Sequence, residues 1–208
     1  MRYFDSGFTA AIAAVRDQGV APVWFAWFTG RDRDTGAAVD MGFWSGDHDY
    51  ALNVAMPDGS GAETRTYIGG CGLSVSGLYY TADLTDNAIT VALSQIADAA
   101  QYLIRGLDLR LAQCEIHATS LTGAALVSAP QLQFVGIVDE GPISTPSVGS
   151  DGGISLSIRS EIMAMLTATN PAKSSNAHQK RRNPADLFCK FASTINSRKI
   201  QWYRDPDN

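Results

Sequence analysis

The feature that most constrains this 208-residue chain is a series of short segments in which apolar and polar residues alternate, separated by clusters of turn-forming residues. The alternation is clearest in Ile154-Ser-Leu-Ser-Ile-Arg-Ser160, and 107–111 alternates just as strictly. Period-two alternation is typical of β-strands that bury one face. We therefore predict a mainly β fold of about eight to ten strands, either a β-sandwich or a partly open barrel.

The strand pattern also predicts pairings. We expect a first hairpin in which 23–29 returns as 39–44, and a second pair formed by 132–138 and 154–160. A shift in the apolar positions after 107–111 predicts one long strand with a β-bulge near Leu111. The other expected strands are 64–69, 72–77 and 88–94.

Short helices are expected at the N-terminus, in the middle and at the C-terminus, over about 6–17, 96–105 and 184–196. For the last one, Asn183 can cap the helix and Pro184 occupies the first helical position, which proline favours.

Charge divides the chain into two regions. Residues 1–170 carry eight Lys and Arg against eighteen Asp and Glu, a net charge of −10, whereas residues 171–208 carry eight cations against three carboxylates, a net charge of +5. We predict a β-rich body over 1–170, and a basic arm, a helix and a terminal strand over 171–208 that dock on the body or on a neighbouring subunit. The residues expected to carry assembly are Lys180, Arg181, Arg182, Leu187, Phe188, Phe191, Ile195, Ile200 and Trp202.

Cysteine usage and hydropathy exclude several classes of protein. Cys71, Cys114 and Cys189 are far apart and odd in number, which favours free thiols over a disulfide framework or a zinc site. No apolar run reaches about eighteen residues, so stable membrane insertion is not expected. The N-terminus also lacks the layout of a secretory signal.

Motifs for catalysis or for metal binding are few. In 47–49, Asp-His-Asp, a hydrogen-bonded loop is favoured over a metal site because too few ligands converge. The pair Asp32 and Asp34 resembles the start of a calcium loop without its closing Glu, so a hairpin tip is favoured. On a strand, Cys114 and His117 point to opposite faces, which argues against a nucleophile–base pair. We expect no catalytic residue, no metal and no cofactor.

Two further clusters have a structural and a ligand-binding interpretation. The basic triplet 180–182 favours a solvated segment or a salt-bridged contact with an acidic neighbour, and direct DNA binding is not expected. An aromatic cluster would suit either cross-strand pairs in a core or a carbohydrate platform, and the core is favoured. Its members are Trp24, Phe25, Trp27, Phe28, Phe43 and Trp44.

Parts of the chain resemble a known family. Val-Trp-Phe-Ala-Trp-Phe-Thr-Gly-Arg-Asp (23–32), followed by Met-Gly-Phe-Trp-Ser-Gly-Asp-His-Asp (41–49), resembles the opening of the tail-hub family of gene transfer agents and related long-tailed phages. Segments 73–77 and 84–91 resemble the same proteins and the lambda-type minor tail protein at the tail tip. The end, 175–188 with Ile-Gln-Trp at 200–202, is similar to the end of prophage tail proteins.

The resemblance implies a structural protein of the virion, made in the host cytoplasm and located at the tail tip. It implies a ring around the tail axis, most simply a trimer, that connects the tail tube to the tip and receptor-binding proteins. A hexameric distal-tail ring is the first alternative, and a tail-associated hydrolase or a carbohydrate-binding module are further ones. Larger hub relatives carry a C-terminal cysteine cluster that looks like an iron–sulfur site. This chain has only Cys189 there, so the cluster is not carried over.

Overall fold

The computed structural model describes residues 5–14, 22–79, 87–123, 125–141, 143–144, 152–161 and 175–197. The chain divides into two compact units, Met1–Leu166 and Thr167–Asn208.

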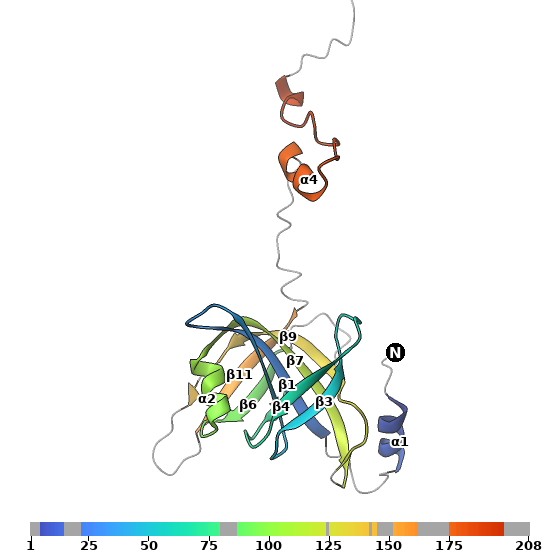
Figure 1. Cartoon of the computed structure of the whole chain (residues 1–208), viewed down its shortest axis with the longest axis vertical. Helices are drawn as coiled ribbons and strands as arrows, with labels where there is room; N and C mark the ends of the chain where they lie inside the picture. Colours follow the sequence, from blue (N-terminus) through green and yellow to red (C-terminus); the bar gives the residue numbers. More distant parts are fainter. Residues whose placement is uncertain are drawn as a thin grey trace, which may run out of the picture. The chain divides into compact units, whose positions relative to one another are not determined.

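The first unit is mainly β, as predicted, and its strands form one strongly curled open sheet, half of a barrel (Figure 1). Among the described residues the strand order is β3-β4-β2-β1-β7-β9-β11-β6-β5, with β8 beside β7 and β10 beside β11. The neighbouring strands are antiparallel except for β2 and β4, which are parallel. The strands are β1 Pro22–Asp32, β2 Ala38–Trp44, β3 Tyr50–Ala55, β4 Ala62–Ile68, β5 Ser74–Ser76, β6 Ile89–Ser94, β7 Leu107–Thr122, β8 Ala125–Leu126, β9 Gln131–Glu140, β10 Ile143–Ser144 and β11 Gly153–Ser160.

Both predicted strand pairings are confirmed, since β1 pairs with β2 and β9 pairs with β11. Strand β3 was not among the strands predicted from the sequence. Its signal is present, however, as Tyr50, Leu52 and Val54 alternate with Ala51 and Asn53.

The β-bulge predicted near Leu111 is confirmed. Leu111 has φ 59°, and it is the one non-glycine residue in the described chain with a positive φ. The register between β1 and β7 jumps from Thr29 opposite Gln113 to Arg31 opposite Asp108. Four residues of β7, 109–112, therefore lie opposite Gly30 alone, and the strand bends there.

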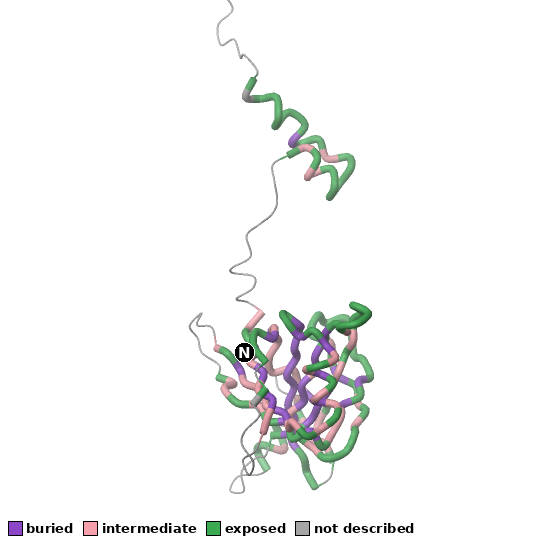
Figure 2. Tube along the Cα trace, turned by 90° about the vertical axis from the view of Figure 1, so that its left-hand side faces the viewer, coloured by how far each residue is buried: buried purple, intermediate pink, exposed green. Residues whose placement is uncertain are grey.

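The two faces of the sheet bury different clusters, because successive side chains on a strand point in opposite directions. One face holds the larger cluster, which includes Phe28, Phe43 and Leu156. The other face holds Phe25 and Tyr67 with three more buried side chains. Figure 2 shows buried segments running along the strands of this unit.

The aromatic residues of β1 and β2 form cross-strand pairs, as favoured from the sequence. Phe25 stacks on Trp44 with ring centroids 5.7 Å apart, and Phe28 meets Phe43 edge-on at 6.1 Å. All four are buried, so they cannot form an exposed platform for a sugar.

Two helices of this unit lie within the described residues. Helix α1 (Ser6–Ala14) and helix α2 (Asp98–Arg105) both begin close to where they were expected. Asp17, the expected end of the first helix, lies outside the described residues. In α2, Ala100 and Leu103 are the buried positions, as its amphipathic spacing predicted.

In the second unit the helix lies earlier than predicted. Helix α4 spans Asn176–Arg182, and Asn183 follows it in an extended conformation instead of starting a helix. Proline disfavours the helical conformation of the residue before it, so Asn183 before Pro184 ends α4. The prediction of a helix over 184–196 is wrong.

The segment after Pro184 is a run of turns that ends in the short 3-10 helix η1 (Ile195–Ser197). Its backbone bonds mostly join residues three apart, such as Lys190 N–H to the Leu187 carbonyl at 3.0 Å. The Asp186 carboxylate accepts from Phe188 N–H at 2.9 Å. Such local side-chain bonds compete with an α-helix.

Candidate functional site

The cations that were predicted to carry assembly lie together on α4. Ser175 caps this helix, since its Oγ accepts a hydrogen bond from His178 N–H at 3.2 Å. Lys180, Arg181 and Arg182 occupy the last turn, where positive charge is favoured by the helix dipole. All three side chains are exposed, and none forms an ion pair with another described residue of the chain.

The four apolar residues predicted for assembly are exposed within their unit. The exposed fractions are 56% for Leu187, 92% for Phe188, 58% for Phe191 and 63% for Ile195. Burial of Phe188 and Phe191 is therefore not achieved within their own unit, and burial against a neighbour stays a prediction. Between them only Cys189 is buried. Ile200 and Trp202, also predicted for assembly, lie outside the described residues.

The body contains a buried ion pair that the sequence analysis missed. Arg65 on β4 and Glu115 on β7 are 3% and 5% exposed, and Arg65 Nη1 lies 2.6 Å from Glu115 Oε2. The Arg65 guanidinium also lies 4.6 Å from the centre of the Trp27 ring. Strands β4 and β7 are separated in the sheet by β2 and β1. The side chains can therefore meet only because the sheet curls tightly.

Gly42 on β2 helps to make this curl possible. A Cβ atom at that position would lie 2.6 Å from the Trp27 ring and 2.8 Å from the Thr66 carbonyl oxygen. Such distances are too short for any side chain, so glycine allows β1 and β4 to approach closely. The sequence signal for the ion pair was the alternation Thr64-Arg-Thr-Tyr, which places Arg65 on the same face as Tyr67.

Burial governs the ionisation of this cluster. Burial alone disfavours the charged guanidinium, but the hydrogen bonds that it donates to the carboxylates of Glu115 and Glu63 outweigh burial and raise the pKa of Arg65. Burial raises the pKa of Tyr67 to about 12. Burial, with the charge of Arg65, lowers the pKa of His117 to about 3, so this histidine is neutral near pH 7.

His117 and Cys114 do not form a catalytic pair. Cys114 belongs to the larger core, whereas His117 lies on the other face of β7, as the strand geometry predicted. His117 Nε2 lies 3.8 Å from Glu115 Oε2, and neither ring nitrogen makes a hydrogen bond within the described structure. Burial raises the pKa of the Cys114 thiol well above its ordinary value, which disfavours the reactive thiolate.

The two acidic loops are hydrogen-bonded turns. Asp32 Oδ1 accepts from the backbone of Asp34 and Thr35 and from the Thr35 hydroxyl, which makes the hairpin tip. In the second loop, Asp49 accepts from Gly69 N–H at 3.1 Å, and His48 offers its carbonyl oxygen to Trp44. Within the described ranges, no group of three or more His, Cys, Asp or Glu side chains has an arrangement suited to a metal ion.

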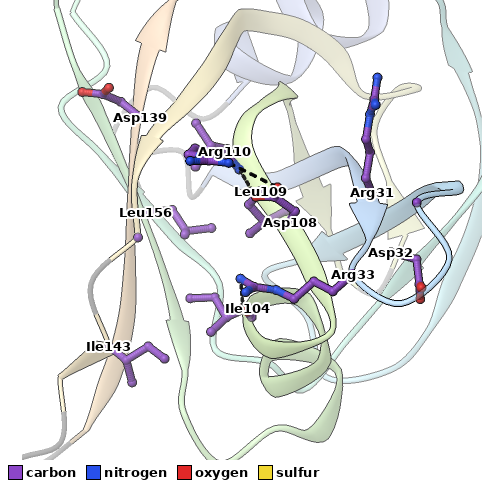
Figure 3. Close-up of a pocket in the computed structure, with 13 residues that line it drawn as sticks. Arg31, Asp32, Arg33, Ile104, Asp108, Leu109, Arg110, Asp139, Ile143 and Leu156 are labelled. Atoms are coloured by element: carbon purple, nitrogen blue, oxygen red, sulfur yellow. Dashed lines mark hydrogen bonds and ion pairs between the residues drawn. The ribbon is translucent and has the colours of Figure 1, made fainter.

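A cleft of about 780 Å³ opens in the body between the β1–β2 hairpin tip, the start of β7 and the end of β9 (Figure 3). Arg31, Arg33 and Arg110 line it together with Leu109 and Leu156. Figure 3 shows Arg33 extending from the hairpin tip towards Ile104. This cleft was not predicted from the sequence, because it lies where the neighbouring strands β7 and β9 separate beyond Gln113 and Ile137, and no pairing between these strands was predicted.

No protein-family model and no curated protein matches this sequence. None of the described helices has the length and apolar character needed to cross a membrane.

Proposed function

We propose that this protein is a structural component of a virion, located at the distal end of a long-tailed phage tail. In this role its second unit docks on neighbouring subunits and holds a ring together. The observation that carries the proposal is the exposure of four large apolar side chains beside three cations on one small unit. The resemblance of 23–32 and 41–49 to tail-hub proteins, and of 175–188 to prophage tail proteins, supports the same role.

The apolar residues of the second unit contribute little to its own fold. Cys189 is its one buried residue among 175–195 and 197, the positions whose burial is described. Burying a phenylalanine side chain stabilises a complex by roughly 1.5–3 kcal/mol. Phe188 is 92% exposed and Phe191 is 58% exposed. Burying them in an interface would therefore still provide most of this stabilisation. Exposed apolar groups of this kind mark interaction sites.

Charge favours a second copy of the chain, or an acidic neighbour, as the partner. The first unit carries a net charge of −10, and the second carries +5. Arginine binds carboxylates through a planar fork, which makes Arg181 and Arg182 suitable for bridging subunits. In the tail, the proposed assembly is a trimer or a hexamer, with tail-tube and tip proteins as the other neighbours.

The apolar contribution is tested with the full-length chain by light scattering and negative-stain electron microscopy. Wild type is expected to form closed rings. The double variant Phe188→Ser, Phe191→Ser is expected to be monomeric. Ile96→Ser, at a position that is 91% exposed on the first unit, is the matched control and should leave the rings intact. A monomeric wild type that binds an oligosaccharide would overturn the proposal and favour a carbohydrate-binding module.

The charge contribution is tested separately by replacing Lys180, Arg181 and Arg182 with Ser. This variant should assemble more weakly while its unfolding free energy stays nearly unchanged. Wild-type rings should also loosen with added salt, because exposed charges are screened over about 10 Å at 0.1 M. Arg105→Ser on α2 is the control for loss of an exposed cation. Assembly that responds neither to salt nor to the triple substitution would show that α4 takes no part in it.

A further inference from the structure

The cleft in the first unit lies where the sheet separates. The ladder between β7 and β9 begins at Gln113 opposite Ile137, and it does not extend towards the start of β7. Residues 109–112 pair with neither β1 nor β9 in the two registers. On the other side, Val138 and Glu140 of β9 pair with β11 alone beyond that point. Two strand edges thus border the cleft without bonding to each other.

Unpaired strand edges carry backbone donors and acceptors that can bond to an added strand. Arg33 bonds to the main chain beside the cleft, because its Nε donates to the Leu107 carbonyl at 2.9 Å. Its Nη2 reaches the Ile104 carbonyl at 3.3 Å. These contacts fix the Arg33 guanidinium at the cleft without neutralising its charge.

The lining of the cleft holds three arginines and three aspartates, whereas the rest of residues 1–170 has five cations against fifteen carboxylates, so the cleft is the less negative part of the body. Arg31, Arg33 and Arg110 are three of the eight cations in residues 1–170. Arg110 is 83% exposed, and its nearest carboxylate, Asp108, lies 3.9 Å away. The other two carboxylates of the lining are engaged elsewhere, Asp32 in the hairpin tip and Asp139 with Arg159 at 2.9 Å. Figure 3 shows the Asp139 carboxylate pointing away from Arg33 and Arg110.

We propose that this cleft binds an extended peptide segment that carries aspartate or glutamate side chains and belongs to a neighbouring protein. The carboxylates of the segment bind Arg33 and Arg110, and its apolar side chains contact Ile104 and Ile143, which are the more accessible aliphatic residues of the lining. Its backbone bonds to main-chain groups of 109, 111 and 112, which have no cross-strand partner in either register, whereas the Arg110 N–H already donates to Asp108. This inference uses only the first unit and does not depend on the role proposed for the second.

The composition of the cleft favours a peptide over other anions. Nucleic-acid grooves combine cations with aromatic side chains for stacking, whereas the apolar residues of this lining are aliphatic. A peptide of alternating acidic and aliphatic residues matches both the arginines and the aliphatic floor, because its two kinds of side chain face opposite directions.

The experiment measures binding of a fluorescent peptide, acetyl-(Asp-Val)4-amide, to the full-length chain by anisotropy. An (Asn-Val)4 peptide of the same length is the charge control. Arg110→Gln is expected to weaken binding about tenfold, equivalent to about 1.4 kcal/mol. Arg33→Gln should do the same, with thermal unfolding recorded because Arg33 also holds two carbonyl groups. Arg105→Gln, an exposed cation outside the lining, should leave the affinity unchanged.

Several results would overturn the proposal. One is the absence of saturable binding of the acidic peptide. Another is equal binding of the Asn-Val peptide, and a third is an unchanged affinity in Arg110→Gln. Competition by acetate or inorganic phosphate as effective as by unlabelled peptide would show a simple anion site. If Arg110→Gln instead abolishes self-assembly and the peptide does not bind, the occupant of the cleft is a second copy of the chain. Failure of the second unit to support rings would leave the peptide result unaffected, so the two proposals fail separately.

Discussion

Phe28 in the first unit and Phe188 in the second are the same residue type in opposite surroundings. Phe28 is fully buried against Phe43, whereas Phe188 is 92% exposed. The first unit uses its aromatic residues to hold its sheet together, while the described part of the second unit is ordered mainly by local hydrogen bonds. Substitutions should therefore affect stability in the first unit and association in the second.

The largest contrast is expected between Phe28→Ala and Phe188→Ala. The first leaves a cavity in the larger core and should lower the free energy of unfolding by roughly 3–5 kcal/mol. The second removes an exposed side chain and should change it by less than about 0.5 kcal/mol. Urea unfolding of the full-length chain measures both. A loss of more than 2 kcal/mol for Phe188→Ala would show that the second unit is folded by that side chain.

Substitutions of charged residues should show the same contrast in stability between the two units. Glu115→Gln removes the buried one of the two carboxylates that pair with Arg65 and leaves only the exposed Glu63, so we expect a loss of about 3 kcal/mol, because breaking a buried ion pair is strongly destabilising. The double variant Arg65→Met, Glu115→Leu should recover most of this loss. Arg181→Ala on α4 should be neutral within about 0.5 kcal/mol. An equally small loss for Glu115→Gln would mean that water reaches the Arg65 pair.

Acid should weaken the first unit through His117. Its folded pKa of about 3 lies below the unfolded value of about 6.5. The unfolded chain therefore binds the extra proton, and stability is fully present above pH 6.5 and falls as the pH drops towards 3. Between pH 7 and 5 the loss from this residue should be about 2 kcal/mol. His117→Gln should reduce the change in the free energy of unfolding between pH 7 and 5 by about 2 kcal/mol. An unchanged pH dependence would contradict the lowered pKa of His117.

The sequence predicted the strands best where one face is buried. Segment 154–160 alternates because Ile154, Leu156 and Ile158 enter one core while the serines between them point away. The bulge at Leu111 was also visible, since an extra residue shifts the alternation itself. Both signals are local, and both depend on contacts with the nearest strands.

Contacts produced by the curl of the sheet could not be predicted in the same way. Arg65 and Glu115 are fifty residues apart, and they meet across two intervening strands. The arginine-lined cleft likewise depends on where two ladders separate, which is a property of the whole sheet. In the second unit, a stripe of apolar residues was interpreted as a helix. Without a surface to bury it, such a stripe supplies no packing energy for a helix of that length.

The smallest expected effect tests whether local hydrogen bonds or apolar side chains order the second unit. If local bonds order it, the Ser175 cap of α4 should matter more than any apolar side chain there. Ser175→Ala removes the acceptor for His178 N–H, and such a loss costs a helix about 1 kcal/mol. Nuclear magnetic resonance of the full-length chain should show lower helicity for 176–182 and faster amide exchange at His178, with the signals of the first unit unchanged.

Ser175→Asp, which keeps an acceptor at the positive end of the helix, should restore the helicity. Phe191→Ala, the matched substitution of an exposed apolar residue, should leave the helicity unaltered in the monomer. The opposite result, melting by Phe191→Ala but not by Ser175→Ala, would show that the second unit has a core of its own, and the comparison between the two units would then fail.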